Sequence, residues 1–156
     1  MDNLSLLKSC PLFFELYDKE ILKLVKYCSV YTFADGEHIV TDGTEGDQIF
    51  VLLQGEARVE KDTGEERLFI QPLESGDVFG EMALMGEKQR TADVVSSGHS
   101  SVLEIRYDQI FKLFAKEPRI FGLLLFNISR LVSRRLAHSN AIIVRLQKEA
   151  TQKDVA

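Results

Sequence analysis

Residues 76–94 read Gly-Asp-Val-Phe-Gly-Glu-Met-Ala-Leu-Met-Gly-Glu-Lys-Gln-Arg-Thr-Ala-Asp-Val, which is the densest cluster of unusual residues in the chain. A strand-sized lead-in ends at Gly80, and a stretch able to form a short helix follows over residues 81–85. A helix N-terminus preceded by glycine offers free N–H groups and the positive end of a dipole, and both favour an anion such as phosphate. The stretch therefore predicts an anion-binding turn.

Two charged side chains of the same stretch are placed to complete such a site. Arg90 follows Glu81 by nine positions and can return to the same pocket as a bidentate partner for phosphate. Glu81 is then free to accept hydrogen bonds from a sugar hydroxyl. A glycine, a glutamate and an arginine on one small site suit a phosphorylated sugar. Taken alone, the same residues also fit an ordinary surface loop closed by a salt bridge.

Short apolar runs punctuated by glycine turns surround this stretch, between about Val30 and Ile105. The turn signals are Asp35-Gly, Asp42-Gly, Glu45-Gly-Asp, Gln54-Gly, Thr63-Gly, Ser75-Gly-Asp and Ser97-Gly. Turn signals at such short spacings are typical of an all-β sandwich or barrel. We therefore expect a β-roll over about 30–105.

Helical periodicity flanks this zone on both sides. Before it, leucines at helical spacing predict helices within residues 3–27, separated at Pro11. After it, residues 108–148 predict two helices, with Pro118 in the first turn of the longer one. The predicted fold is mainly β, with N-terminal helices, then the β-roll, then a long C-terminal helix.

Composition places the chain among single-domain globular proteins. Its 156 residues are 45% hydrophobic and 28% charged, which is enough for a core and argues against disorder. Cys10 and Cys28 are too few for a disulfide scaffold, and the three histidines stand apart, so neither metal nor cofactor is expected. No GxSxG elbow or other catalytic pattern is found, so we expect no enzymatic activity.

We expect a cytoplasmic protein whose single domain spans residues 1–156. The N-terminus lacks the basic region of a signal peptide. The longest uncharged stretch near the C-terminus, residues 120–129, has ten residues, whereas a bilayer-spanning helix needs about 20. No membrane span is therefore predicted.

In this order, the elements resemble the cyclic nucleotide-binding domain family. Its phosphate-binding cassette typically reads Phe-Gly-Glu, an aliphatic residue, Ala-Leu, a variable loop, then Arg and a small residue. Here these are Phe79-Gly-Glu-Met-Ala-Leu84 and Arg90-Thr-Ala92. The upstream segments Phe33–Ile39 and Gly46–Gly55 also look like the family's turns. The resemblance runs from about Leu4 to Lys148 and implies a double-stranded β-helix, or jelly roll, as in the bacterial cyclic-AMP receptor protein and the cyclic nucleotide-dependent kinases.

The resemblance implies a ligand site residue by residue. The backbone N–H groups of Gly80, Met82 and Ala83 would lie near the phosphate or ribose of a cyclic nucleotide. Glu81 would hold the ribose 2′-hydroxyl. The expected contact residues are Phe79, Gly80, Glu81, Met82, Ala83, Arg90, Thr91, Ala92, Ser139 and Asn140.

The second half of the cassette would complete the phosphate contacts. Arg90 would pair with the exocyclic phosphate oxygens, and Thr91 would add a hydroxyl contact. Gln89 stands where many members of the family have proline. That difference relaxes the loop but removes no group that contacts the ligand, so we expect binding to survive it.

The base preference depends on Thr91 and on the long helix. In the family, a threonine directly after the cassette arginine often accompanies cyclic GMP recognition. Residues 134–140, Arg-Arg-Leu-Ala-His-Ser-Asn, resemble the helix that contacts adenine in the bacterial receptor. Ser139 and Asn140 are therefore candidate base contacts, with a solvated helix face as the alternative. We expect cyclic AMP as the ligand, with cyclic GMP as the alternative.

The C-terminal helix also offers a surface for partners. Residues 119–156 carry seven basic and two acidic side chains. Apolar residues form an imperfect heptad seam on this helix that can pack on the roll or pair with its twin in a homodimer; they are Leu125, Ile128, Val132, Ile142 and Leu146. Only residues 149–156 follow the predicted helix, too few for a recognition helix, so sequence-specific DNA binding is not expected.

These features support three hypotheses about function. The first is a signal-transduction module that binds a cyclic nucleotide and repositions its C-terminal helix for an unknown effector protein or a dimer mate. The second is a transcription regulator of the cyclic-AMP receptor type that lacks its winged helix. The third is a ligandless roll that serves as an interaction scaffold.

Overall fold

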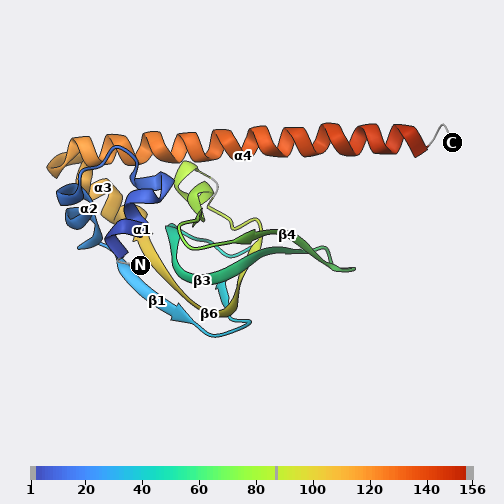
Figure 1. Cartoon of the computed structure of the whole chain (residues 1–156), viewed down its shortest axis with the longest axis horizontal. Helices are drawn as coiled ribbons and strands as arrows, with labels where there is room; N and C mark the ends of the chain where they lie inside the picture. Colours follow the sequence, from blue (N-terminus) through green and yellow to red (C-terminus); the bar gives the residue numbers. More distant parts are fainter. Residues whose placement is uncertain (1–2, 87, 154–156) are drawn as a thin grey trace.

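The computed structural model describes residues 3–86 and 88–153 (Figure 1). Its elements follow the predicted order of short helices, then strands, then helices. The domain predicted over 1–156 also includes residues 1–2, 87 and 154–156, which lie outside the described part. None of the described helices is both long enough and apolar enough to cross a bilayer.

The N-terminal helices are α1 (Asn3–Ser9), the 3-10 turn η1 (Pro11–Phe13) and α2 (Asp18–Val25). Pro11 begins η1 and thus separates the two helices, as its fixed φ and missing N–H favour a first helical position. At the start of α2 the Glu20 carboxylate accepts a hydrogen bond from the backbone N–H of Tyr17 at 2.8 Å. This bond satisfies one of the free N–H groups at the helix N-terminus.

The six described strands form one antiparallel sheet that is rolled on itself, which confirms the predicted β-roll. The order is β1-β6-β3-β4, while β2 also pairs with β6 and β5 with β3. The long strands β3 and β6 are the spine of the roll. The strands are β1 (Ser29–Phe33), β2 (His38–Val40), β3 (Gln48–Asp62), β4 (Arg67–Leu73), β5 (Val78–Phe79) and β6 (Asp93–Arg106).

The spine bends where β3 and β6 lose register, between Leu52 and Glu56. Gly55 lies at this irregularity with φ +86°. A Cβ there would overlap the carbonyl oxygen of His99 on the facing strand. A residue without a side chain is therefore required, and the bulge lets one long pair of strands curve around a core instead of remaining flat.

Two apolar clusters hold the fold together. The larger lies between the sheet and the helices and includes Ile21, Ile49, Ile105 and Ile128. The smaller fills the inside of the roll; its buried members are Val40, Phe50, Leu52, Ala57, Leu73, Phe79, Val94 and Val102. The second cluster supports the floor on which the candidate site lies.

The chain ends in α3 (Tyr107–Lys116) and α4 (Pro118–Lys153). The first part of α4 packs on the body, and its Asn127 side chain donates to the carbonyls of Leu12 and Phe14. The later part extends beyond the body as a single rod (Figure 1), and residues 136–152 are exposed. The helix continues to Lys153 rather than ending at about Lys148, because no glycine or proline interrupts it there.

Candidate functional site

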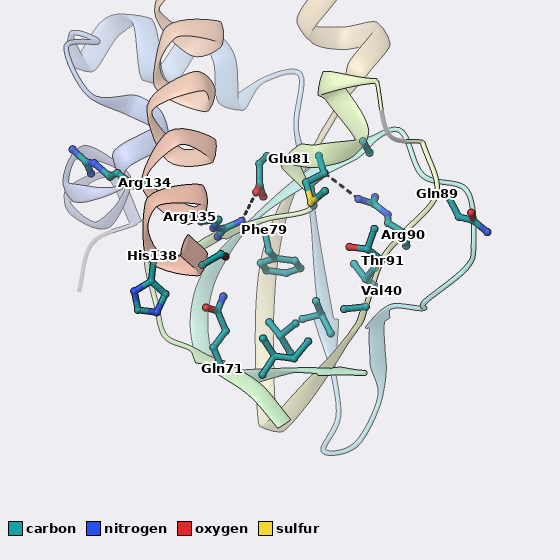
Figure 2. Close-up of a pocket in the computed structure, with 18 residues that line it drawn as sticks. Val40, Gln71, Phe79, Glu81, Gln89, Arg90, Thr91, Arg134, Arg135 and His138 are labelled. Carbon is teal, nitrogen blue, oxygen red and sulfur yellow. Dashed lines mark hydrogen bonds and ion pairs between the residues drawn. The ribbon is translucent and has the colours of Figure 1, made fainter. Parts of the chain in front are cut away.

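A pocket of about 590 Å³ lies between the roll and α4. Figure 2 shows side chains from the cassette turn, from the strands of the roll and from α4 gathered around it. Three sides of the pocket therefore come from segments far apart in the sequence. The lining residues are Val40, Val59, Ile70, Gln71, Phe79, Gly80, Glu81, Met82, Ala83, Gln89, Arg90, Thr91, Ala92, Val94, Arg134, Arg135, His138 and Ser139.

The predicted anion-binding turn begins where β5 ends. Gly80 has the left-handed conformation (φ 78°) and caps a 3-10 helix, η2, over Glu81–Met85. A Cβ at Gly80 would stand 2.8 Å from Nη1 of Arg90 and 3.0 Å from the Gln48 carbonyl oxygen. Both the backbone conformation and the close approach of Arg90 therefore require glycine at this position.

Arg90 is a charged residue of the pocket lining, and it is only 8% exposed. Its Nη1 donates to the Gly80 carbonyl at 3.0 Å, and its Nη2 donates to the carbonyl and to Oε1 of Gln48 at 2.9 and 3.0 Å. Burial lowers the pKa of Arg90 from its ordinary value, against the opposing charges of Asp47, Glu81 and Glu104. An arginine stays protonated in spite of this, so the pocket contains a fixed, partly desolvated cation.

Glu81 is more deeply buried, at 3% exposure, and its partner comes from α4. Its Oε1 accepts a hydrogen bond from Nη1 of Arg135, whose Nη2 donates to the carbonyl of Val78 (Figure 2). A buried carboxylate is costly without a partner, and Arg135 supplies one. The cassette turn and α4 are thus joined by an ion pair between two residues that line the pocket.

Nine of the ten residues that the sequence singled out line this pocket. The structure places Ser139 there but not Asn140, the next residue on α4. Successive residues on a helix point about 100° apart, so one of two neighbours generally faces a given surface. Direct contact of these residues with a ligand stays a prediction, and Asn140 is the position at which the geometry gives least support.

Sequence reasoning missed the contribution of Arg135. Residue 135 lies four positions before Ser139, so the two share a helix face. That spacing was a usable signal once Ser139 had been proposed. The ion pair between Arg135 and Glu81 could not be predicted from the sequence, because it depends on how α4 crosses the roll. The same holds for Gln71 and Ile70 of β4, which reach the pocket only because the sheet is rolled.

The arrangement suits binding an anion through charge-assisted hydrogen bonds. A buried guanidinium, a glycine-led turn and a buried carboxylate offer donors and an acceptor to one small molecule. In the part of the chain that the structure describes, no three His, Cys, Asp or Glu side chains are grouped to hold a metal ion.

Comparison with known proteins agrees with this geometry. A family model described as "Cyclic nucleotide-binding domain" matches residues 30–117, more than half of the chain. The cGMP-dependent protein kinase, isozyme 2 forms cD5/T2, of Drosophila melanogaster is 36% identical over 99 residues, which are 62% of this chain and 10% of that kinase. The chain therefore spans about a tenth of the length of this relative.

Solved structures give the same result for the fold. A cyclic nucleotide-binding domain from Methylobacillus flagellatus KT superposes with a TM-score of 0.80 at 25% identity, covering 90% of this chain and 80% of that one. The catabolite activator protein of Thermus thermophilus superposes with a TM-score of 0.78, also at 25% identity, covering 88% of this chain and 63% of that one.

Proposed function

The chain belongs to the cyclic nucleotide-binding domain family, and from that premise we propose that it senses a cyclic nucleotide and transmits occupancy through α4. The proposed role is binding, not catalysis. The observation that carries it is the meeting of the buried Arg90 and Glu81 side chains at one pocket beneath α4.

Arg90 provides the phosphate contact in this proposal. A cyclic phosphodiester carries one negative charge, and a guanidinium can donate charge-assisted hydrogen bonds to its oxygens. The environment of Arg90 is partly desolvated, so each of these hydrogen bonds is stronger than it would be in water. The positive end of η2 adds little, because that helix has only five residues.

Glu81 provides the ribose contact and the link to the output helix. The 2′-hydroxyl of a bound nucleotide would donate to this carboxylate, which Arg135 already contacts from α4. The ligand and Arg135 therefore share one acceptor group. Occupancy changes the interaction between Glu81 and Arg135, and an unequal affinity for two positions of α4 is what allows a ligand to shift that helix.

The base would lie toward α4, and cyclic AMP is the favoured ligand. Ser139 lines the pocket and offers a hydroxyl to the purine edge, while Thr91 lies on the cassette side of the same pocket. A threonine on the cassette side also suits the guanine amino group, so cyclic GMP is the alternative.

The output would be read from the distal part of α4. Residues 136–152 are exposed, and large apolar side chains are among them: Leu136, Ile142, Ile143, Val144 and Leu146. Exposed apolar side chains on a helix are suited to pairing with the same helix of a second copy or with a helix of an effector protein. In this proposal the protein works in the cytoplasm, as part of a signalling pathway.

Isothermal titration of the purified chain with cyclic AMP and, separately, cyclic GMP tests the proposal. We expect saturable binding of at least one nucleotide, which Arg90→Ala reduces by at least about a hundredfold through loss of two charge-assisted hydrogen bonds. Arg145→Ala, on the exposed end of α4, is the matched control and should bind like the wild type. Absence of binding by folded, ligand-free wild-type protein would contradict the sensor role and favour the scaffold.

A further inference from the structure

Gly46 precedes β3, outside the cassette, and its backbone does not require glycine. The chain has ten glycines, and eight of them have positive φ angles. Gly46 and Gly122 are the two that do not. An alanine is therefore compatible with the backbone at position 46, and the reason for a glycine there must be sought in the space around it.

That space is occupied by the guanidinium of Arg90. A Cβ built on Gly46 would overlap Nε and Nη2 of Arg90 and would stand 2.5 Å from its Cζ. Real Cβ atoms essentially never approach other heavy atoms this closely. At Gly122, by contrast, nothing lies within 4 Å of the corresponding point. The missing side chain at Gly46 thus makes room for one particular group.

The two main-chain segments cannot easily separate, because backbone hydrogen bonds join them. The N–H of Gly46 donates to the carbonyl of Lys88 at 3.0 Å, and the N–H of Arg90 donates to the carbonyl of Thr44 at 2.8 Å. The N–H of Gly43 donates to the carbonyl of Arg90 at 2.9 Å. The main chain beside Gly46 is therefore fixed against the main chain that carries Arg90.

Gln48 completes the enclosure from the first position of β3. Its carbonyl oxygen and its Oε1 both accept from Nη2 of Arg90, at 2.9 and 3.0 Å, while the Gly80 carbonyl accepts from Nη1. Three of the five N–H donors of a guanidinium are thus bonded to protein acceptors. Residues Gly46, Gln48 and Gly80 form what we call the arginine socket.

We propose that Gly46 and Gln48 are positioning residues that fix the Arg90 guanidinium for phosphate binding, so that phosphate affinity is set partly outside the cassette. This inference rests on the proposed function. The socket orients the guanidinium plane before a ligand arrives and so reduces the entropy that must be lost on binding. The Nε–H and the second N–H of Nη1 take no part in these three bonds, so they remain as donors for an anion.

A second cavity shows why the socket can be disturbed without unfolding the protein. This cavity has a volume of about 350 Å³ and shares Arg90 with the main pocket, and Glu45, Gln48 and Glu104 also line it. A guanidinium pushed away by a methyl group at position 46 has room there, beside two carboxylates. Gly46→Ala should therefore misplace Arg90 while the fold is retained.

The experiment compares Gly46→Ala with Gly122→Ala and the wild type in titrations with cyclic AMP. We expect Gly46→Ala to bind at least about tenfold more weakly, which is the effect of one lost charge-assisted hydrogen bond. Gly122→Ala should bind like the wild type. The Arg90 Nε–H resonance in ¹H–¹⁵N spectra, assigned by its absence in Arg90→Lys, should shift in Gly46→Ala and not in Gly122→Ala.

Gln48→Leu is the second variant and keeps the test decisive if Gly46→Ala fails to fold. It removes one acceptor of Nη2 and no backbone group, so we expect a loss of a few-fold in affinity together with a shifted Arg90 resonance. A folded Gly46→Ala with wild-type affinity overturns the inference, as does a Gln48→Leu variant that changes neither affinity nor resonance. If Arg90→Ala retains wild-type affinity, the proposed function itself is contradicted. If Arg90→Ala loses affinity but the Gly46 and Gln48 variants do not, only the inference about the socket is contradicted.

Discussion

Arg135 follows Glu81 by 54 positions in the sequence, yet its guanidinium donates to Oε1 of that buried carboxylate. The contact is the point at which α4 is bonded to the cassette turn. Arg135 is 38% exposed at its side chain, whereas Glu81 is enclosed. The ion pair therefore joins a partly exposed arginine of α4 to an enclosed carboxylate of the cassette turn.

Arg135→Ala is expected to loosen α4 in the ligand-free protein. Without the guanidinium, Glu81 and the Val78 carbonyl lose their donors from the helix, so amides near residue 135 should exchange with deuterium faster. Arg145→Ala, which removes an arginine from the exposed end of α4, is the control and should leave this region unchanged. Equal exchange in all three proteins would mean that other contacts hold the helix.

Ser139→Ala and Asn140→Ala are expected to differ although they are neighbours. The pocket is lined by Ser139 but not by Asn140. Loss of one hydrogen bond to the base should weaken cyclic AMP binding by about three- to tenfold in Ser139→Ala, and Asn140→Ala should have little effect. Titration of both variants checks this. An effect confined to Asn140→Ala would mean that α4 turns when ligand binds.

The stability of the fold should depend on Glu20 in acid. Burial opposes its ionisation, but the Tyr17 N–H and the Arg119 guanidinium outweigh burial and place the pKa of Glu20 below its ordinary value. A carboxylate with a depressed folded-state pKa stabilises the fold above its unfolded-state pKa, and this stability is lost as pH falls through the folded-state value. The ordinary pKa is 4.5, so the loss lies below about pH 4.5.

Urea unfolding of Glu20→Gln measures this contribution. We expect the variant to be less stable than the wild type at pH 7 and the difference to shrink at about pH 3, where the wild type has lost the same charge. Glu149→Gln, on the exposed end of α4, should show no such trend. A stability difference that is the same at both pH values would contradict the assignment.

Asn127→Ala is expected to destabilise the protein by about 1–3 kcal/mol, since it removes a donor from two carbonyls in a buried contact. The Asn127 side chain is 1% exposed and bonds to Leu12 and Phe14, so it fastens α4 to the segment around η1. Chemical denaturation gives the free energy of unfolding. Ser129→Ala, which removes only a hydroxyl bonded within the helix, is the comparison and should change stability much less.

Local patterns in the sequence were sufficient for much of the fold and for part of the site. Gly80 and the helix-forming stretch after it predicted a turn that the structure contains, because φ preference and capping act over a few residues. The roll itself followed from turn spacing. The register of the strands could not be predicted in this way, since nothing near Gly55 in the sequence indicates that it lies against the His99 carbonyl across the sheet.

The remaining site residues depend on long-range packing. Arg135 meets Glu81 only because α4 crosses the roll beside η2, and Gly46 meets Arg90 only because the 43–46 turn is bonded to residues 88–90. In the sequence, Gly46 cannot be distinguished from the other glycines that mark turns. Its backbone conformation, which any residue could adopt, indicates instead that the glycine is there because of a side chain 44 positions away.

The exposed rod formed by the end of α4 has a mechanical consequence. From Arg135 to Lys153 the helix rises by about 27 Å, taking 1.5 Å per residue. A tilt of about 10° at the Glu81 contact would therefore move the tip by about 5 Å, which is close to the rise of one helical turn. If α4 transmits occupancy as proposed, the rod would act as a lever arm that pivots at the Glu81 contact, and its length would set the displacement that a partner meets at the tip.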